Sequence, residues 1–119
     1  MTTTRTTPPT SGALTPDEVY AEFRRAEDFL ASGRPADAAR IVAPVVELDP
    51  SHLAAVELLA RAYYDSAQLT RAEAALRRLV ELAPSDGWAR LALARVLERQ
   101  SRGGEAAPHR RVAEALGWS

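Results

Sequence analysis

The sequence predicts an all-α protein made of three antiparallel helix pairs, and three observations carry that prediction. The first is a period of 34 residues, seen in two columns of alanine: Ala26, Ala60 and Ala94, and Ala38, Ala72 and Ala106. The second is the return of the segment ELDP at residues 47–50 as ELAP at residues 81–84. The third is that short polar turns divide the chain into six helical stretches. A fixed period of this length indicates one supersecondary unit that is repeated, with each copy burying a face against the next.

The chain starts with a polar segment, MTTTRTTPPTSGAL at residues 1–14, which is rich in Thr and Pro and has almost nothing to bury. We expect this segment to be disordered, because it lacks the apolar surface that would offset the entropy of ordering it. The folded domain is then expected over residues 15–119. Its three repeats should cover about residues 16–50, 51–84 and 85–118.

The first helix has clear boundary signals. It is expected from about Pro16 to Ala31, with Thr15 as its cap and Glu18 completing a capping box. Gly33 follows, and a glycine there can take the left-handed conformation that commonly ends a helix. These signals predict a short turn between the first and second helices.

Similar signals place the other five helices. Their expected ranges are about 35–48, 51–66, 70–82, 84–100 and 105–116. Pro44 should interrupt the second helix with a bend, because proline has no backbone donor. Thr70 and Glu73 form a second capping box, which would open the fourth helix. Gly103-Gly104 should break the chain before the sixth.

Composition excludes several classes of function. The 15 basic residues, all arginine, and the 16 acidic residues are mixed along the chain, and the net charge is −1. Without a basic stripe, nucleic-acid binding and anionic-membrane binding are disfavoured. No apolar stretch is long enough to span a membrane, and no secretory signal is evident, so we expect a cytoplasmic protein.

The absence of cysteine excludes disulfides, thiolate catalysis and cysteine-ligated zinc. Arginine without lysine, together with abundant alanine, indicates a GC-rich bacterial source.

The chain resembles the tetratricopeptide-repeat family, whose unit is a helix–turn–helix of 34 residues. The middle repeat carries the best match, with residues at the family's spacing: Leu59, Ala60, Tyr63, Ala67, Ala72, Leu76 and Pro84. The first repeat departs from the pattern at Arg25, where a buried Leu is usual. The third departs at Arg110, where the middle repeat has Leu76. The resemblance covers about residues 16–118 and implies a right-handed α-solenoid whose outer repeats act as end caps.

The resemblance also implies a protein-interaction module that binds a peptide or protein segment in a concave groove lined by the first helix of each pair. Read at spacings of three and four, the candidate groove residues are Tyr20, Phe23, Glu27, Glu57, Arg61, Tyr64, Trp88, Leu91, Arg95 and Glu98. Aromatic residues and arginine are enriched at binding hot spots. Arg61 and Arg95 are the candidates for anchoring an acidic group. Family members that clamp a terminal carboxylate use Lys and Asn on these helices, and this chain has neither.

Plainer interpretations of these residues stay open. Glu27 and Arg61 could form an ion pair between repeats, and the aromatic side chains could belong partly to the core. His52 and His109 are interpreted as ordinary residues near helix starts, and no catalytic constellation, metal site or cofactor motif is evident. We therefore expect no enzyme. The alternative function is a self-associating structural subunit, a homodimer through the terminal helices that uses Leu116 and Trp118.

Overall fold

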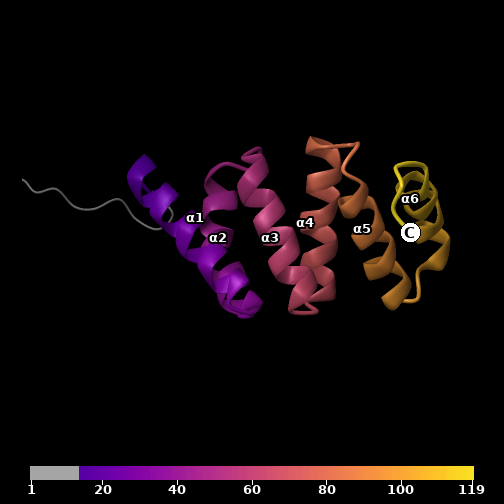
Figure 1. Ribbon diagram of the computed structural model, residues 1–119, viewed down its shortest axis with the longest axis horizontal. Coiled ribbons are helices and arrows are strands. Elements are labelled where there is room, and N and C mark those ends of the chain that lie inside the picture. The colour runs from indigo at the N-terminus through magenta and orange to yellow at the C-terminus, as the bar shows by residue number, and fades with distance from the viewer. Residues whose placement is uncertain (1–13) are drawn as a thin grey trace, which may run out of the picture.

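The computed structural model describes residues 14–119, which form six α-helices packed one after another in chain order (Figure 1). Each helix packs against the next along the chain, and α1 also contacts α3. The molecule is elongated and measures 64 by 26 by 24 Å. The segment predicted to be disordered, residues 1–14, lies outside this described range except for Leu14.

The prediction of an all-α fold of three helix pairs is confirmed. The helices are α1 (Pro16–Ala31), α2 (Pro35–Leu48), α3 (Leu53–Asp65), α4 (Leu69–Leu82), α5 (Gly87–Arg99) and α6 (Gly103–Ala115). Each pair is α1 with α2, α3 with α4, and α5 with α6. The first two helices have the predicted bounds, and the others begin or end within about two or three residues of them.

The alanine columns form the centre of the core. All six alanines of the two columns are 0% exposed: Ala26, Ala60, Ala94, Ala38, Ala72 and Ala106. The largest side chains buried with them are leucine and valine, including Leu76, Leu79, Leu93 and Leu97. Because alanine projects only a methyl group, two helix backbones can approach closely wherever a column lies between them. The period of the sequence is therefore also the period of the packing.

The turn within each helix pair repeats with the same period. Gly33, Ala67 and Ser101 have φ angles of 77°, 56° and 62°, so each adopts the left-handed conformation. The second helix of each pair then begins two residues later, at Pro35, Leu69 or Gly103. The left-handed turn expected at Gly33 is confirmed, and the other two repeats make the same turn without glycine.

This register overturns two predictions about helix starts. Thr70 lies inside α4, whose cap residue Gln68 makes no side-chain capping bond, so the predicted capping box with Glu73 is wrong. Gly103 and Gly104 form the first turn of α6 and do not break the chain before it. In both cases the shared turn geometry fixes where the helix starts, and the local sequence signal is overridden. At α1, which opens the first helix pair, the predicted capping box of Thr15 and Glu18 is present.

Pro44 does not end α2, and the bend expected there stays a prediction. The helix runs unbroken from Pro35 to Leu48 with Pro44 inside it. Val42 and Val45, on either side of the proline, are 0% and 1% exposed. Their burial in the core holds this turn helical despite the missing backbone donor.

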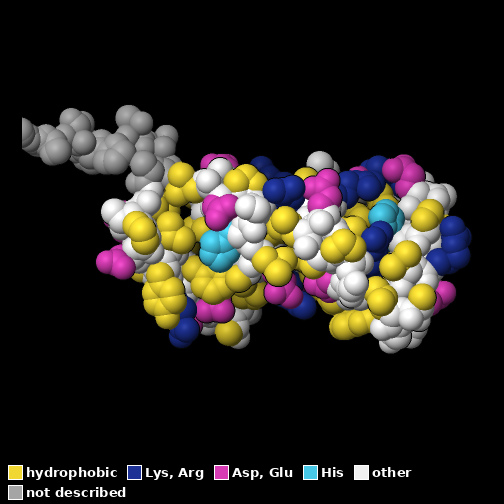
Figure 2. Space-filling view, turned by 90° about the horizontal axis from the view of Figure 1, so that it is seen from above, with side chains coloured by type: hydrophobic (Ala, Val, Ile, Leu, Met, Phe, Trp, Pro, Cys, Tyr) yellow, Lys and Arg dark blue, Asp and Glu magenta, His cyan; other side chains and the backbone are white. Residues whose placement is uncertain are grey.

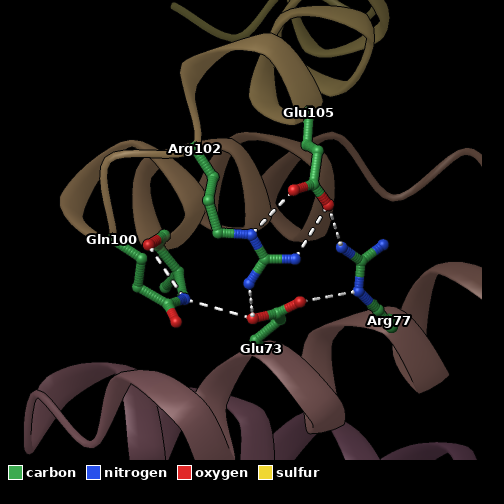
Figure 3. Close-up of polar contacts among 6 residues, drawn as sticks. Glu73, Arg77, Gln100, Arg102 and Glu105 are labelled. Atoms are coloured by element: carbon green, nitrogen blue, oxygen red, sulfur yellow. Dashed lines mark hydrogen bonds and ion pairs between the residues drawn. The ribbon is translucent and has the colours of Figure 1, made fainter.

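A charged network joins the second repeat to the third (Figure 3). Glu73 on α4 accepts hydrogen bonds from Arg77 Nε at 3.0 Å, Gln100 Nε2 at 3.1 Å and Arg102 Nη1 at 2.7 Å. Arg102 also donates to both carboxylate oxygens of Glu105, each at 2.8 Å. Because Gln100 and Arg102 flank the turn between α5 and α6, the network ties that turn to α4.

Glu73 is the partly buried centre of this network, with its side chain 14% exposed. Burial alone would raise the pKa of the Glu73 carboxyl. Hydrogen bonds from Arg102, Arg77 and Gln100 outweigh the burial and hold that pKa below its usual value. The folded state therefore favours the ionised carboxylate.

Ala60→Leu should destabilise the fold, because the position is fully buried between helices and three more carbon atoms overpack it. We expect the free energy of unfolding to fall by about 1–3 kcal/mol. Each kcal/mol corresponds to about 4–8 °C in the melting temperature for a domain of this size. The matched control is Ala21→Leu on the exposed side of α1, which should change stability by less than about 0.5 kcal/mol. Equal melting temperatures for the two variants would contradict this account of the alanine columns.

Glu73→Gln should cost about 1–3 kcal/mol of stability at neutral pH, because it removes the charge that three donors share. Since the pKa of Glu73 is lowered on folding, its contribution is present above the ordinary value of 4.5 and is lost as the pH falls through the lowered pKa. Denaturation of both proteins between neutral and acidic pH should therefore give curves that converge in acid. The control Glu81→Gln removes a carboxylate that is 66% exposed and should have little effect at neutral pH. A constant difference between wild type and Glu73→Gln across this range would contradict the role of ionisation.

Candidate functional site

The predicted groove residues lie on α1, α3 and α5, the first helix of each pair. We call the side of these three helices that carries them the odd-helix face. The residues assigned to it are Tyr20, Phe23 and Glu27 on α1, Glu57, Arg61 and Tyr64 on α3, and Trp88, Leu91, Arg95 and Glu98 on α5. Some of these side chains are in contact with one another, and others are buried or lie apart.

The centre of the face is a stacked group contributed by α3 and α5. The Arg61 guanidinium lies 4.0 Å from the centroid of the Trp88 ring, and Tyr64 packs edge-on against the same ring at 5.8 Å. An Arg61 nitrogen is also 3.6 Å from a carboxylate oxygen of Glu57, one turn earlier on α3. Arg61 remains 41% exposed, so its guanidinium can still donate hydrogen bonds to an incoming group. Tyr64 and Trp88 also pack against the core, as the plainer interpretation of the aromatics expected.

A shallow hollow of about 240 Å³ lies between α1 and α3, beside the stacked group of Arg61, Tyr64 and Trp88. Its lining includes Phe23, Glu27, Glu57 and Arg61, so acidic and basic groups face the same space. Within residues 14–119 no ion pair joins Glu27 to Arg61. Glu27 lies 3.5 Å from Arg24 on its own helix instead. The ion pair between repeats is therefore not formed, because each charge has a partner one turn away on its own helix.

A larger hollow of about 550 Å³ lies at the amino-terminal end, where α1 begins, α2 ends and α3 begins. Its walls are mostly apolar and include Val19, Tyr20, Phe23 and Leu48. Figure 2 shows hydrophobic side chains gathered over this end of the molecule. We call this space the amino-terminal hollow. Phe23 lines both hollows, so the odd-helix face continues into it.

His52 contributes to this region in a way that the sequence analysis missed. It caps α3, accepting a hydrogen bond from the backbone N–H of Ala55 at 3.2 Å, which agrees with an ordinary helix-start residue. Its ring also stacks on Phe23, with ring centroids 6.1 Å apart. The cap could have been predicted from the 34-residue period, because Asp86, the equivalent of His52 in the next repeat, caps α5 in the same way. No signal in the sequence indicated the stacking.

The carboxyl-terminal part of the face differs from expectation. Leu91 is only 5% exposed, so it is a core residue and does not line an open groove. Because α5 packs against both α4 and α6, its buried surface is wide enough to include this position. Arg95 is exposed, and no ion pair involves it within residues 14–119.

Glu98 is held by Arg110 of α6, which donates to both carboxylate oxygens at 2.9 and 2.7 Å. Hydrogen bonding from Arg110 lowers the pKa of the Glu98 carboxyl, although partial desolvation opposes the shift. The residue that breaks the repeat pattern at position 110 therefore neutralises the last acidic group of the face. A ligand carboxylate would meet less repulsion near Arg95 because of this pair.

The remaining ionisable groups form no further centre in the described part of the chain. His109 lies 3.2 Å from Arg90, and burial, followed by the charges of Arg90 and Arg77, lowers its pKa. Between residues 14 and 119, no three histidine, cysteine, aspartate or glutamate side chains are grouped to hold a metal ion. No helix in that range is both long and apolar enough to cross a membrane.

Comparison with known proteins agrees with this architecture. The family model of the tetratricopeptide repeat matches residues 29–87. A solved structure of a MamA mutant superposes with a TM-score of 0.80 at 24% identity, covering 89% of this chain and 77% of that one. The structure titled "MamA 41-end from Desulfovibrio magneticus RS-1" gives a TM-score of 0.74 at 24% identity, covering 86% of this chain and 58% of that one. The structure titled "Crystal structure of MamA" gives 0.76 at 21% identity, covering 85% of this chain and 59% of that one.

At these identities the solved structures establish the fold alone, and this chain spans less than two thirds of most of them. None of the curated proteins matches the chain. Tetratricopeptide repeats are generally protein-interaction modules and are typically non-catalytic. With its 34-residue period, its three helix pairs and the matching family model, the chain belongs to the tetratricopeptide-repeat family.

Proposed function

We propose that the protein is an adaptor that binds a peptide or protein segment along the odd-helix face, and that it acts by binding and not by catalysis. The observation that carries this proposal is the Arg61 guanidinium, stacked 4.0 Å above Trp88 and still 41% exposed. A cytoplasmic location, which the sequence predicts, is part of the proposal.

The stacked arginine favours recognition of a carboxylate. The Trp88 ring restrains the guanidinium, so less conformational entropy is lost when Arg61 binds a ligand. A ligand carboxylate can form two parallel hydrogen bonds with a guanidinium, whereas Glu57 lies 3.6 Å from it and forms a weaker contact. The ligand can therefore displace Glu57 without leaving a buried charge unpaired, since Glu57 is itself 43% exposed.

The rest of the face suggests how a ligand extends from this point. Apolar contact is available at Phe23 toward the amino-terminal hollow, and a second exposed guanidinium is available at Arg95 toward the carboxyl-terminal end. An extended segment that lies across α1, α3 and α5 would meet both of these groups. We propose a ligand with an acidic group at Arg61 or Arg95 and an apolar side chain near Phe23.

Two substitutions should each weaken peptide binding. Trp88→Ala removes the ring on which Arg61 stacks, and Arg61→Gln removes the positive charge that would bind the ligand carboxylate. Peptides would be selected on the wild-type protein from a random library displayed on phage, and their affinities measured by fluorescence titration. We expect losses of about 30-fold or more for each variant, as for a hot-spot residue. The matched control is Arg71→Gln, which removes an exposed arginine from α4 outside the face, and it should bind as wild type does.

Circular dichroism melts would show whether Trp88→Ala retains the fold, and Arg61→Gln alters only a half-exposed side chain. Selected peptides rich in acidic and apolar residues would support the proposal. Peptides that bind Arg61→Gln as tightly as wild type, or that lose affinity only with Arg71→Gln, would contradict it.

A further inference from the structure

The two ends of the molecule carry opposite net charge. Residues 14–50, the first helix pair, contain eight acidic and four basic residues, which gives a net charge of −4. Residues 85–119, the third pair, contain four acidic and six basic residues, which gives +2, and the middle pair at residues 51–84 is neutral. The overall charge of −1 hides this gradient along the 64 Å axis. Such a gradient favours contact between unlike ends of two molecules.

The same two ends carry the exposed apolar surface. Within residues 14–119, the large hydrophobic side chains that are exposed are Tyr20, Leu48 and Leu53 toward one end, and Leu116 and Trp118 at the other. None of them lies on α4 or α5, which separate the two groups. An exposed apolar patch that is confined to one place on a surface is typical of an interaction site.

The two patches differ in shape. The amino-terminal end holds the hollow of about 550 Å³, lined by apolar side chains and by the carboxylate-bearing Asp49. At the carboxyl-terminal end, Trp118 folds back onto the start of α5. Its indole fills the space where a side chain on Gly87 would lie, while 43% of Trp118 stays exposed. The ring is thus fixed in place against α5. Leu116 and Trp118 both follow the end of α6, and the exposed Arg111 lies in the last turns of that helix.

We propose that a second copy of the chain docks head to tail, with Leu116 and Trp118 of one molecule placed against the amino-terminal hollow of the next. The apolar side chains of one end meet an apolar hollow, and the basic end meets the acidic one. The proposal does not rest on peptide binding. The hollow shares Tyr20 and Phe23 with the odd-helix face, whereas Leu116 and Trp118 are not part of that face.

The geometry of the stack allows this contact. The hollow lies where α1 begins and α2 ends, and the Trp118 seat lies where α5 begins and α6 ends. Successive helices run in opposite directions, so both sites lie at the same edge of the molecule (Figure 1). A copy shifted along the long axis therefore brings one site to the other. A two-fold dimer would instead place ends of like charge together, −4 against −4 through the hollows or +2 against +2 through Leu116 and Trp118, and like-charge repulsion disfavours both.

The contact should be weak and should not close on itself. The molecule is only 26 by 24 Å across its short axes, so an end-to-end contact lies near the lower limit of about 1,200 Å² for stable interfaces. A head-to-tail contact leaves a free site at each end of any assembly, so the mass should keep rising with concentration.

Sedimentation equilibrium of the full chain tests this, in low salt and over a range of concentrations from about 10 µM to about 1 mM, where small interfaces associate. We expect the average mass to rise from 12.9 kDa to more than twice that value, and to fall again on addition of salt, which screens the charges. A wild-type protein that stays at the mass of one chain throughout would overturn the proposal.

Two variants and their mixture identify the interface. Leu48→Lys places a positive charge in the hollow, and Leu116→Glu places a negative charge at the opposite end. Both positions are exposed, at 45% and 41%, so the fold should tolerate the changes, and circular dichroism checks this. Each variant alone should remain a single chain. Their equimolar mixture should form a dimer, because one intact hollow then meets one intact carboxyl-terminal end.

The average mass of the wild type and of this mixture distinguishes head-to-tail docking from a two-fold dimer. A wild-type dimer that stops at two chains, or a mixture that stays at the mass of one chain while wild type associates, would overturn the head-to-tail contact. Trp88→Ala serves as the control. It should associate as wild type does, and Leu116→Glu, which leaves both the odd-helix face and the hollow intact, should bind selected peptides as wild type does, so that failure of one proposal is distinguishable from failure of the other.

Discussion

The close approach of helices at two columns of fully buried alanine is the constraint on which the rest of the structure depends. Ala26, Ala60 and Ala94 recur every 34 residues at 0% exposure, so each pair repeats the packing of the one before it. That repetition places α1, α3 and α5 in a common register. Arg61 on α3 can reach the Trp88 ring on α5 only because the helices are held at this spacing. The candidate site is thus a consequence of how the smallest side chains pack.

Most of the fold could be predicted from the sequence, because its period is also the period of its packing. Helices α1 and α2 have the predicted ends, and the alanine columns are buried as their spacing indicated. The errors occurred where a local signal competed with tertiary packing. Thr70 and Glu73 have the spacing of a capping box, yet α4 begins before them, at Leu69. Gly103 usually marks a break, yet the left-handed turn at Ser101 starts α6 there.

The candidate site was less predictable, because periodicity gives the side of a helix but not the contacts that a side chain makes. Helical spacing placed Leu91 on the same face as Trp88, and the structure buries it. Spacing also could not show that Arg61 stacks on Trp88, or that Arg110 reaches from α6 to Glu98. These contacts cross between helices and depend on side-chain conformations that the sequence does not fix. Arg110 was visible as a departure from the repeat, but its partner was not.

We propose that a rigid core of stacked repeats presents a preformed binding face on α3 and α5. Native-state hydrogen exchange, resolved by residue, tests it most directly without requiring a partner. We expect the hydrogen-bonded backbone amides of α3 and α5 to exchange only through global unfolding, whereas those of α6, which packs against one neighbour, exchange through local opening. If the hydrogen-bonded amides around Arg61 and in the middle of α5 exchanged as fast as those at the end of α6, the face would not be preformed, which would contradict this proposal.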